Sequence, residues 1–495
     1  MGIKKYYSNK DNTIANAFEA NLITRATGSN MGAADILEAF VIHGQTSASI
    51  NAANAEQSRI IIQFPIDSIQ ADIDSGVLPA DTGSIKLHLN LYNAPHGSTT
   101  PENYTLDLKM IAQDWNEGRG LDMDNYSDIG VSNWISASSG NAWTSEGGSF
   151  IAGTNTSASV SFDTGLENIS VDVSEQVYKW LDATDNYGFL IKFPDSAVSG
   201  SDSLYTKKFF GRTSEFFHYQ PTIEARWDSA RKDNRGNFYI SSSMAPASDN
   251  LNTLYLYNVI RGQLTNIPGL ADNKLLVEVY SGDTGPTGSP LTIINSDGIS
   301  ATAVTGGLLV ENGGVVTGVY TASFASTSTS ETLFDVWLTG SGGSRIEFHT
   351  GSYEPKPVNT SDLLYDRAYL TAITNLHDKY KKGQKPKLRV FVRDKDWSPN
   401  IYTVANANVE TTTIEDAYYR IFRSIDNLEI VSYGTGSSNN NFTRLSYDVS
   451  GNYFELDTSF LEPGYMYGIK FAYYLQGEYR EQSEVFKFKI EEDDV

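Results

Sequence analysis

The stretch Lys207 to Trp227 reads Lys-Lys-Phe-Phe-Gly-Arg-Thr-Ser-Glu-Phe-Phe-His-Tyr-Gln-Pro-Thr-Ile-Glu-Ala-Arg-Trp and ends in the pattern of a β-strand. In its last part Ile223, Ala225 and Trp227 alternate with polar residues, so the apolar side chains share one face. Upstream, two pairs of phenylalanines flank a polar turn. We interpret the stretch as the closing part of a β-sandwich that begins near the N-terminus, and as the joint to the domains that follow.

Composition favours an all-β protein with several domains. The chain has 495 residues, which is too long for one ordinary core, so two to four domains are expected. Its 29 Tyr and 23 Phe residues, with frequent Thr, Ser, Val and Gly, favour strands and turns over helices. The formal net charge of −23 opposes binding to nucleic acid or to an anionic membrane. The chain has no cysteine, which excludes disulfides, thiolate metal sites and a cysteine nucleophile.

The N-terminus gives no sign of targeting to a membrane. The opening residues, Met-Gly-Ile-Lys-Lys-Tyr-Tyr, lack the apolar region of a secretory signal peptide. No apolar stretch is long enough to span a bilayer. We therefore expect no membrane insertion. If the protein works outside the cell, we expect it to leave by lysis or by a dedicated machine.

Residues 1–228 carry the densest strand signals. Residues 85–91 alternate between apolar and polar, as in a sheet with one face exposed to solvent. The apolar positions are Ile85, Leu87, Leu89 and Leu91. A long loop rich in Asn, Gly, Ser and Asp follows the next strand, and a short helix precedes the strand at 189–193. Eight or more strands joined by long, uneven connections predict a jelly-roll sandwich.

The motifs of this region resemble the jelly-roll modules called DNRLRE domains, which occur in surface and carbohydrate-associated proteins. The matching segments are Ser58–Phe64, Ile85–Tyr92, Asp114–Gly118, Val171–Val173 with Val177 and Trp180, Asn186–Lys192, Phe210–Glu215 and Pro221–Trp227. The resemblance implies structural roles for Trp115, whose indole would pack, and for Gly118, which would permit a tight turn. Between the two phenylalanine pairs, Arg212 is expected to hold a carboxylate across the edge of the sandwich.

The continuation Arg226–Phe238, together with the Ser/Thr-rich β modules after it, is similar to virion structural proteins of tailed marine bacteriophages. This second resemblance implies a component that is assembled in the host cytoplasm, released without a signal peptide, and located in the virion.

Two further sandwiches are expected after the first domain. Residues 229–236, Ser-Ala-Arg-Lys-Asp-Asn-Arg-Gly, are interpreted as a charged linker. Residues 237–356 and 357–495 are each interpreted as an immunoglobulin-like or fibronectin-like β-sandwich. In the last of these, Pro463-Gly464-Tyr465 precedes the Tyr467 strand, as in the corner that leads into a late strand of such sandwiches.

No catalytic constellation stands out in the sequence. The six histidines are scattered, and no nucleophile elbow, Walker loop or dinucleotide fingerprint is present. Asp114 with Glu117 is weak evidence for a glycosidase in so acidic a chain. Asp122, Asp124 and Asp128 are calcium candidates, but the Gly and terminal Glu of an EF-hand are absent, which favours a solvated acidic loop. We expect no cofactor and no catalytic residue.

Two sets of residues are candidates for binding partners. Trp134 and Trp143, in a Ser/Gly/Asn-rich loop, are candidates for stacking on a glycan, against the alternative that they anchor the core. In the basic stretch 379–395, the candidates for docking on an acidic neighbouring subunit are Lys381, Lys382 and Lys385. The alternative for that stretch is the rim of a hairpin.

These observations favour a non-enzymatic virion structural protein: a jelly roll followed by two immunoglobulin-like sandwiches, on a phage tail, neck or collar, or capsid surface. Its partners would be other virion proteins and further copies of itself. The alternative is a carbohydrate-binding adhesin that engages host surface glycans through the loops of the jelly roll. A polysaccharide-degrading enzyme is the third and weakest hypothesis, because no site emerges from the sequence.

Overall fold

The structure is a computed structural model that describes residues 2–43, 55–97, 99–340, 345–357, 368–395, 411–435 and 441–492. The chain divides into two compact units, Ile3–Trp227 and Asp228–Val495, the latter with the first two residues. Within the described ranges, no helix is both long and apolar enough to cross a membrane.

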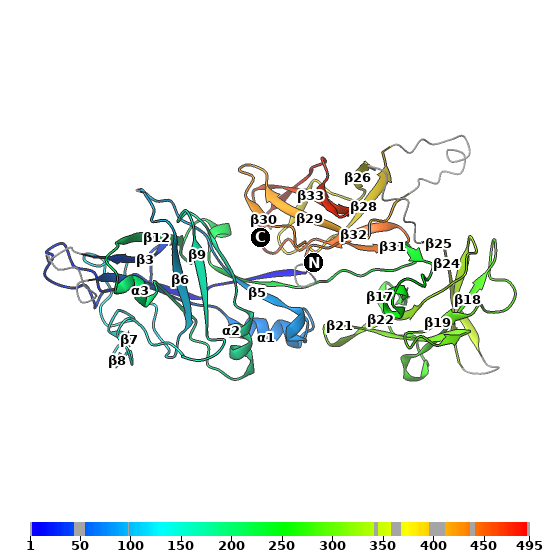
Figure 1. The fold of residues 1–495 in the computed structure, drawn as a ribbon, viewed down its shortest axis with the longest axis horizontal. Coiled ribbons are helices and arrows are strands. Elements are labelled where there is room, and N and C mark those ends of the chain that lie inside the picture. Colours follow the sequence, from blue (N-terminus) through cyan, green and yellow to red (C-terminus); the bar gives the residue numbers. More distant parts are fainter. Residues whose placement is uncertain are drawn as a thin grey trace. The chain divides into compact units, whose positions relative to one another are not determined.

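The first unit is a jelly-roll β-sandwich of two antiparallel sheets (Figure 1). The smaller sheet has the order β1 (Ile3–Tyr7), β13 (Thr222–Arg226), β5 (Lys86–Leu91), β10 (Ile169–Asp172). The larger has the order β12 (Leu204–Phe210), β3 (Ile36–Ile42), β4 (Glu56–Gln63), β11 (Phe189–Lys192), β6 (Tyr104–Met110), β9 (Ser157–Phe162), and β2 (Lys10–Ala15) also pairs with β4. The remaining elements are the hairpin β7 (Ser136–Ser138) and β8 (Asn141–Ala142), helices α1 (Ile66–Asp74), α2 (Ser174–Asp182) and α3 (Asp195–Val198), and the 3-10 turns η2 (Thr82–Ser84) and η3 (Phe217–Tyr219).

The core of this sandwich follows the predicted alternation. Ile85, Leu87, Leu89 and Leu91 are all buried in one cluster with apolar side chains from the facing sheet. Burial of such side chains contributes about 1.5–3 kcal/mol each. Strand β13 pairs with β1 on one side and with β5 on the other, so the last strand completes a sheet that the first strand begins. The predicted closing role of the stretch that ends at Trp227 is thus confirmed.

The second sandwich is built from one continuous antiparallel sheet that supplies two facing halves. Its strand order is β15 (Asn252–Tyr257), β22 (Gly314–Phe324), β21 (Ala303–Glu311), β18 (Leu275–Ser281), β23 (Leu333–Thr339), β24 (Ile346–Tyr353). Strand β21 pairs with β18 up to Gly306 and with β22 from Gly307 onward. Apolar side chains from both halves form one core cluster around Trp337 and Tyr320.

Short elements surround this sheet. They are β14 (Phe238–Tyr239), which pairs in parallel with β25 (Pro355–Lys356), the two-stranded pairs β16 (Val259–Ile260) with β17 (Gln263–Leu264) and β19 (Ile293–Ile294) with β20 (Ser300–Ala301), and the 3-10 turns η4 (Ala247–Asn250) and η5 (Ala271–Asn273).

The third sandwich consists of two sheets. One has the order β26 (Tyr369–Ile373), β28 (Lys387–Asp394), β32 (Gly451–Glu455), β31 (Ser446–Asp448). The other has the order β27 (Lys379–Lys381), β35 (Phe486–Glu491), β33 (Met466–Leu475), β29 (Ala417–Arg423), β30 (Glu429–Val431), with β34 (Glu478–Glu481) beside β33. The Tyr467 hydroxyl donates to the Glu462 carbonyl (2.8 Å) and accepts the Glu462 N–H (2.9 Å). This contact is the tyrosine corner of immunoglobulin-like sandwiches.

Candidate functional site

An arginine–carboxylate pair lies at one edge of the jelly roll. Arg212 donates from Nε to Glu117 Oε1 (3.1 Å) and from Nη2 to Glu117 Oε2 (2.8 Å). The arginine side chain is 34% exposed and the glutamate side chain 20% exposed. The two residues come from two of the motifs that resemble DNRLRE domains. The expectation that Arg212 holds a carboxylate is confirmed.

Asp11 on β2 completes this group. Its Oδ2 accepts the Arg212 N–H (2.5 Å), and its own N–H is donated to Glu117 Oε1 (2.8 Å). The other oxygen, Oδ1, is buried without a hydrogen-bond partner in the described part of the chain. Burial raises the pKa of Asp11 to about 7, helped by the Glu117 charge and opposed by the Arg212 N–H and charge. The carboxyl group therefore titrates near neutral pH.

Buried amides attach the long loop that follows β6 to the sheet. Asn30 donates from Nδ2 to the carbonyls of Glu117 (2.6 Å) and Ser132 (2.8 Å), and Asn12 on β2 donates to Ser132 Oγ (2.8 Å). Gly118 has φ +80°, and a Cβ there would lie 2.4 Å from Asn30 Oδ1. Trp115, three residues before Gly118, is fully buried and donates from Nε1 to the Tyr187 carbonyl (2.9 Å). The predicted structural roles of Trp115 and Gly118 are confirmed.

Trp134 and Trp143 lie in the core beneath this loop. Each is 5% exposed, and both pack in a cluster with Trp115 and aliphatic residues. Trp143 donates from Nε1 to the Asn133 carbonyl (2.8 Å), and the Arg59 guanidinium lies 4.7 Å from the Trp134 ring centroid. Stacking on a sugar needs an open ring face. The glycan-contact prediction for these residues is therefore corrected: they anchor the loop, because the apolar area of an indole is best buried.

In the acidic loop at 119–128, aspartate side chains accept hydrogen bonds from backbone N–H groups of the same loop. Asp122 Oδ1 accepts N–H groups from Asp124, Asn125 and Tyr126 at 2.7–2.9 Å, which lowers the pKa of Asp122. Asp128 Oδ2 accepts the Arg119 N–H (2.8 Å). In the described ranges, no group of three or more His, Cys, Asp or Glu side chains is placed to hold a metal ion. The calcium candidates Asp122, Asp124 and Asp128 thus lie in a loop that hydrogen bonds shape locally.

The segment interpreted as a linker, 229–236, is built into the second unit. Residues 231–233 add in parallel to β31: the Tyr447 N–H is donated to the Arg231 carbonyl and the Asp233 N–H to the Tyr447 carbonyl, each at 3.0 Å. Asn234 then donates to the Thr253 carbonyl on β15 (2.9 Å). Both β31 and β15 end their sheets, so one short segment covers two open strand edges. It connects the second and third sandwiches and is not a free spacer.

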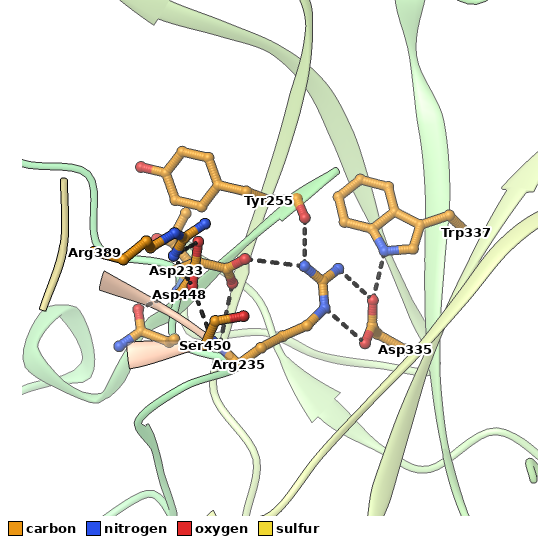
Figure 2. A network of polar contacts seen from close by, with 10 residues as sticks. Asp233, Arg235, Tyr255, Asp335, Trp337, Arg389, Asp448 and Ser450 are labelled. Carbon is orange, nitrogen blue, oxygen red and sulfur yellow. Dashed lines mark hydrogen bonds and ion pairs between the residues drawn. The ribbon is translucent and has the colours of Figure 1, made fainter. Parts of the chain in front are cut away.

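Arg235, next in this segment, is held in a buried network at the second sandwich (Figure 2). It donates from Nε and Nη2 to Asp335 at 3.1 and 2.6 Å, and from Nη1 to Asp233 Oδ2 (3.1 Å) and to the Tyr255 carbonyl. The Trp337 indole N–H is donated to Asp335 Oδ2 (2.6 Å). The arginine side chain is 9% exposed and that of Asp335 fully buried. Burial would lower the pKa of Arg235, but the hydrogen bonds and charge of Asp335 raise it.

A second pair fixes the neighbouring hairpin. Arg231 forms a bidentate ion pair with Glu311, near the tip of the β21–β22 hairpin (2.5 and 3.1 Å). Val310 and Val315 are opposite each other on this hairpin and are 65% and 61% exposed. The hairpin therefore carries two exposed valines near its tip, and the Arg231–Glu311 ion pair attaches it to the segment 229–236.

The basic stretch 379–395 is paired mainly within the third sandwich. Lys379 contacts Glu491 (2.7 Å) and Lys385 contacts Asp457 (3.2 Å), while Arg389 binds Asp448 with both contacts at 2.7 Å. Lys381 and Lys382 lie at the end of β27 with exposed side chains. Docking on a partner through Lys381, Lys382 and Lys385 stays a prediction.

For the buried polar groups that were not predicted, the sequence carries only weak signals. Asp11 and Asn12 are adjacent polar residues in a strand in which both are buried, a pattern that suggests internal hydrogen bonds. Arg235 and Asp335 are 100 residues apart, and nothing in the sequence pairs them.

Comparisons with known proteins add little to this description. No protein-family model matches the chain, and no curated protein matches it. One solved structure that matches is that of the FN1–FN3 domains of chicken CNTN1, with 9% sequence identity and a TM-score of 0.15. The match covers 81% of this chain and 99% of that chain. A TM-score this low carries no weight for the fold, which the strand orders show directly.

Proposed function

We propose that the chain is a non-enzymatic structural protein of a tailed-bacteriophage virion that acts through protein–protein interfaces. Supporting observations are the two sequence resemblances and the all-β architecture. The observation that carries the proposal is the segment 228–237, which pairs with β31 of the third sandwich and hydrogen-bonds to β15 of the second, where Arg235 is buried against Asp335. A segment attached to both sandwiches suits a protein whose role is structural.

The proposed assembly contact is the exposed pair Val310 and Val315, together with the basic end of β27. Apolar side chains on a fixed hairpin bury area on contact without a large ordering cost. Lys381 and Lys382 would add charge complementarity toward an acidic neighbour, either a further copy of this acidic chain or another virion protein.

The direct test is mass spectrometry of purified particles of the phage that encodes the chain. We expect the chain among the proteins that co-purify with intact virions. Its presence in the lysate but absence from purified particles would refute the proposal.

A variant tests the proposed contact. Val310→Lys/Val315→Lys should lower incorporation into particles about tenfold, because two desolvated charges would cost more than 1.4 kcal/mol. The matched control is Val449→Lys, at a valine that is also 61% exposed, in the turn between β31 and β32. Equal incorporation of both variants would show that the hairpin is not the contact.

The two glycan-stacking candidates of the adhesin alternative, Trp134 and Trp143, are buried in the core. It is tested by a glycan array with the full chain, on which we expect no binding. Specific binding to one glycan class would favour the adhesin.

A further inference from the structure

A lysine is buried inside the jelly roll, at an inward-facing position of β12. Lys207 is 0% exposed, and its Nζ lies 5.1 Å from the ring centroid of Phe162 and 4.9 Å from that of Phe209. Lysine is almost never fully buried, because desolvation of its charge is costly. Its place in the core therefore needs an explanation.

Neutral oxygens surround the nitrogen. Nζ lies 2.5 Å from Asn93 Oδ1, 2.8 Å from the Glu167 carbonyl and 2.9 Å from the Gly165 carbonyl. These contacts hold the nitrogen in place without a directly bonded carboxylate. Burial lowers the pKa of Lys207 to about 8, and the Glu167 charge opposes this in part. A larger fraction of neutral amine is thus present near neutral pH than for an ordinary lysine.

The amine lies within reach of the side-chain carbon of Asn93. Since a C=O bond is about 1.2 Å long, Nζ is at most about 3.7 Å from Asn93 Cγ. Reacting atoms held about 3–3.5 Å apart are in a near-attack arrangement. Two backbone hydrogen bonds of 3.0 Å, between Tyr92 and Phe210 and between Ala94 and Lys208, fix the two segments side by side.

Two further groups can assist a reaction at this carbon. His96 Nε2 lies 3.1 Å from Asn93 Oδ1, and with a proton on Nε2 it donates to that oxygen and stabilises negative charge there. Glu167 Oε2 is buried without a hydrogen-bond partner among the described residues, as is the hydroxyl of Tyr104. The N–H groups of Thr164 and Asp163, which donate to Oε1, lower the pKa of Glu167 to about 2, so this carboxylate stays charged and acts on the site through its charge.

We propose that Lys207 and Asn93 join in an intramolecular isopeptide bond. The neutral Nζ attacks Asn93 Cγ, a C–N bond forms, and the bond from Cγ to the amide nitrogen breaks. One proton passes from the attacking nitrogen to the departing nitrogen, and ammonia leaves. Nothing is oxidised or reduced, and no co-reactant is needed.

The bond would close a loop between residues 114 positions apart, from the end of β5 to β12. These strands belong to different sheets, so the bond would fasten one sheet of the sandwich to the other. A cross-link over so long a loop restricts the unfolded chain strongly. In a chain without cysteine, it supplies the kind of constraint that a disulfide gives elsewhere.

The test is the intact mass of the purified, denatured full chain, with allowance for removal of Met1. We expect the mass to fall below the sequence mass by one ammonia, and proteolysis to release a branched peptide that joins the segments of Asn93 and Lys207. Full sequence mass in the folded wild-type protein would overturn the proposal and leave Lys207 as a buried ammonium.

Variants identify the bond. Lys207→Arg should show full mass, whereas Asn93→Asp should lose one water in place of ammonia, since the same amide forms from a carboxylic acid. An ammonia deficit that persists in Lys207→Arg would indicate a succinimide at Asn93 and would overturn the proposal.

Discussion

Two arginine–carboxylate pairs of the same bidentate geometry occupy different surroundings in this protein. Arg212 and Glu117, at the edge of the jelly roll, are about one-third and one-fifth exposed. Arg235 and Asp335, between strands of the second sandwich, are 9% and 0% exposed. From this difference we expect burial, and not the number of hydrogen bonds, to set how much stability depends on each pair. Water can replace a lost partner in the first pair but not in the second.

The largest effect is expected at the buried pair. Arg235→Met should destabilise the unit that begins at Asp228 by about 3–5 kcal/mol, because it leaves the carboxylates of Asp335 and Asp233 buried without a cation. Denaturant unfolding of the full chain, followed by tryptophan fluorescence, measures the change. Arg235→Met/Asp335→Leu should recover part of the loss. A loss below 1 kcal/mol in the single variant would mean that water enters the site.

Asp11, beside the exposed pair, should give the next effect. Its raised pKa of about 7 means that the folded protein binds more protons than the unfolded chain between roughly pH 4 and pH 7, so its contribution to stability falls as pH rises through this window. Asp11→Asn removes this dependence and should be about 4 kcal/mol more stable, relative to wild type, at pH 8 than at pH 4. If the curves of stability against pH were parallel for the wild type and Asp11→Asn, this prediction would be wrong.

The exposed pair itself should matter less. Arg212→Met should cost the first unit about 1–2 kcal/mol, since two charge-assisted hydrogen bonds are lost but Glu117 is still partly hydrated. The loss should shrink at high salt, because screening weakens the pair in the wild type. If Arg212→Met cost as much as Arg235→Met, the role assigned to burial would be wrong.

The smallest effect is expected at the basic end of β27. Lys381→Glu/Lys382→Glu should change the free energy of unfolding by less than about 0.5 kcal/mol, because both side chains are exposed. If these lysines dock on an acidic neighbour, incorporation into particles should nevertheless fall. Unchanged incorporation would mean that these lysines are not contacts. Lys385→Glu, which breaks the ion pair between Lys385 and Asp457, is the comparison variant.

Local patterns predicted much of the fold. The alternation at Ile85–Leu91 predicted both a strand and its buried face, because side chains on successive strand residues point to opposite sides. The same reasoning failed for Trp134 and Trp143. A polar loop sequence suggests exposure, but this loop folds back over its own indoles and is held by Asn30, more than 80 residues away.

The sequence by itself determined many of the strands, where the first unit ends, and that Arg212 would bind a carboxylate, because these follow from periodicity and from local motifs. Only the tertiary structure decided which distant groups meet: Arg235 with Asp335, Asp11 with Glu117, and Lys207 with Asn93. Their partners are about a hundred residues away in the chain, and pairing over such distances depends on strand order and on burial. The segment 229–236 shows the difference most clearly. Its charged residues suggested a solvated linker. In the fold its backbone covers two strand edges, and its Arg235 forms a buried ion pair with Asp335.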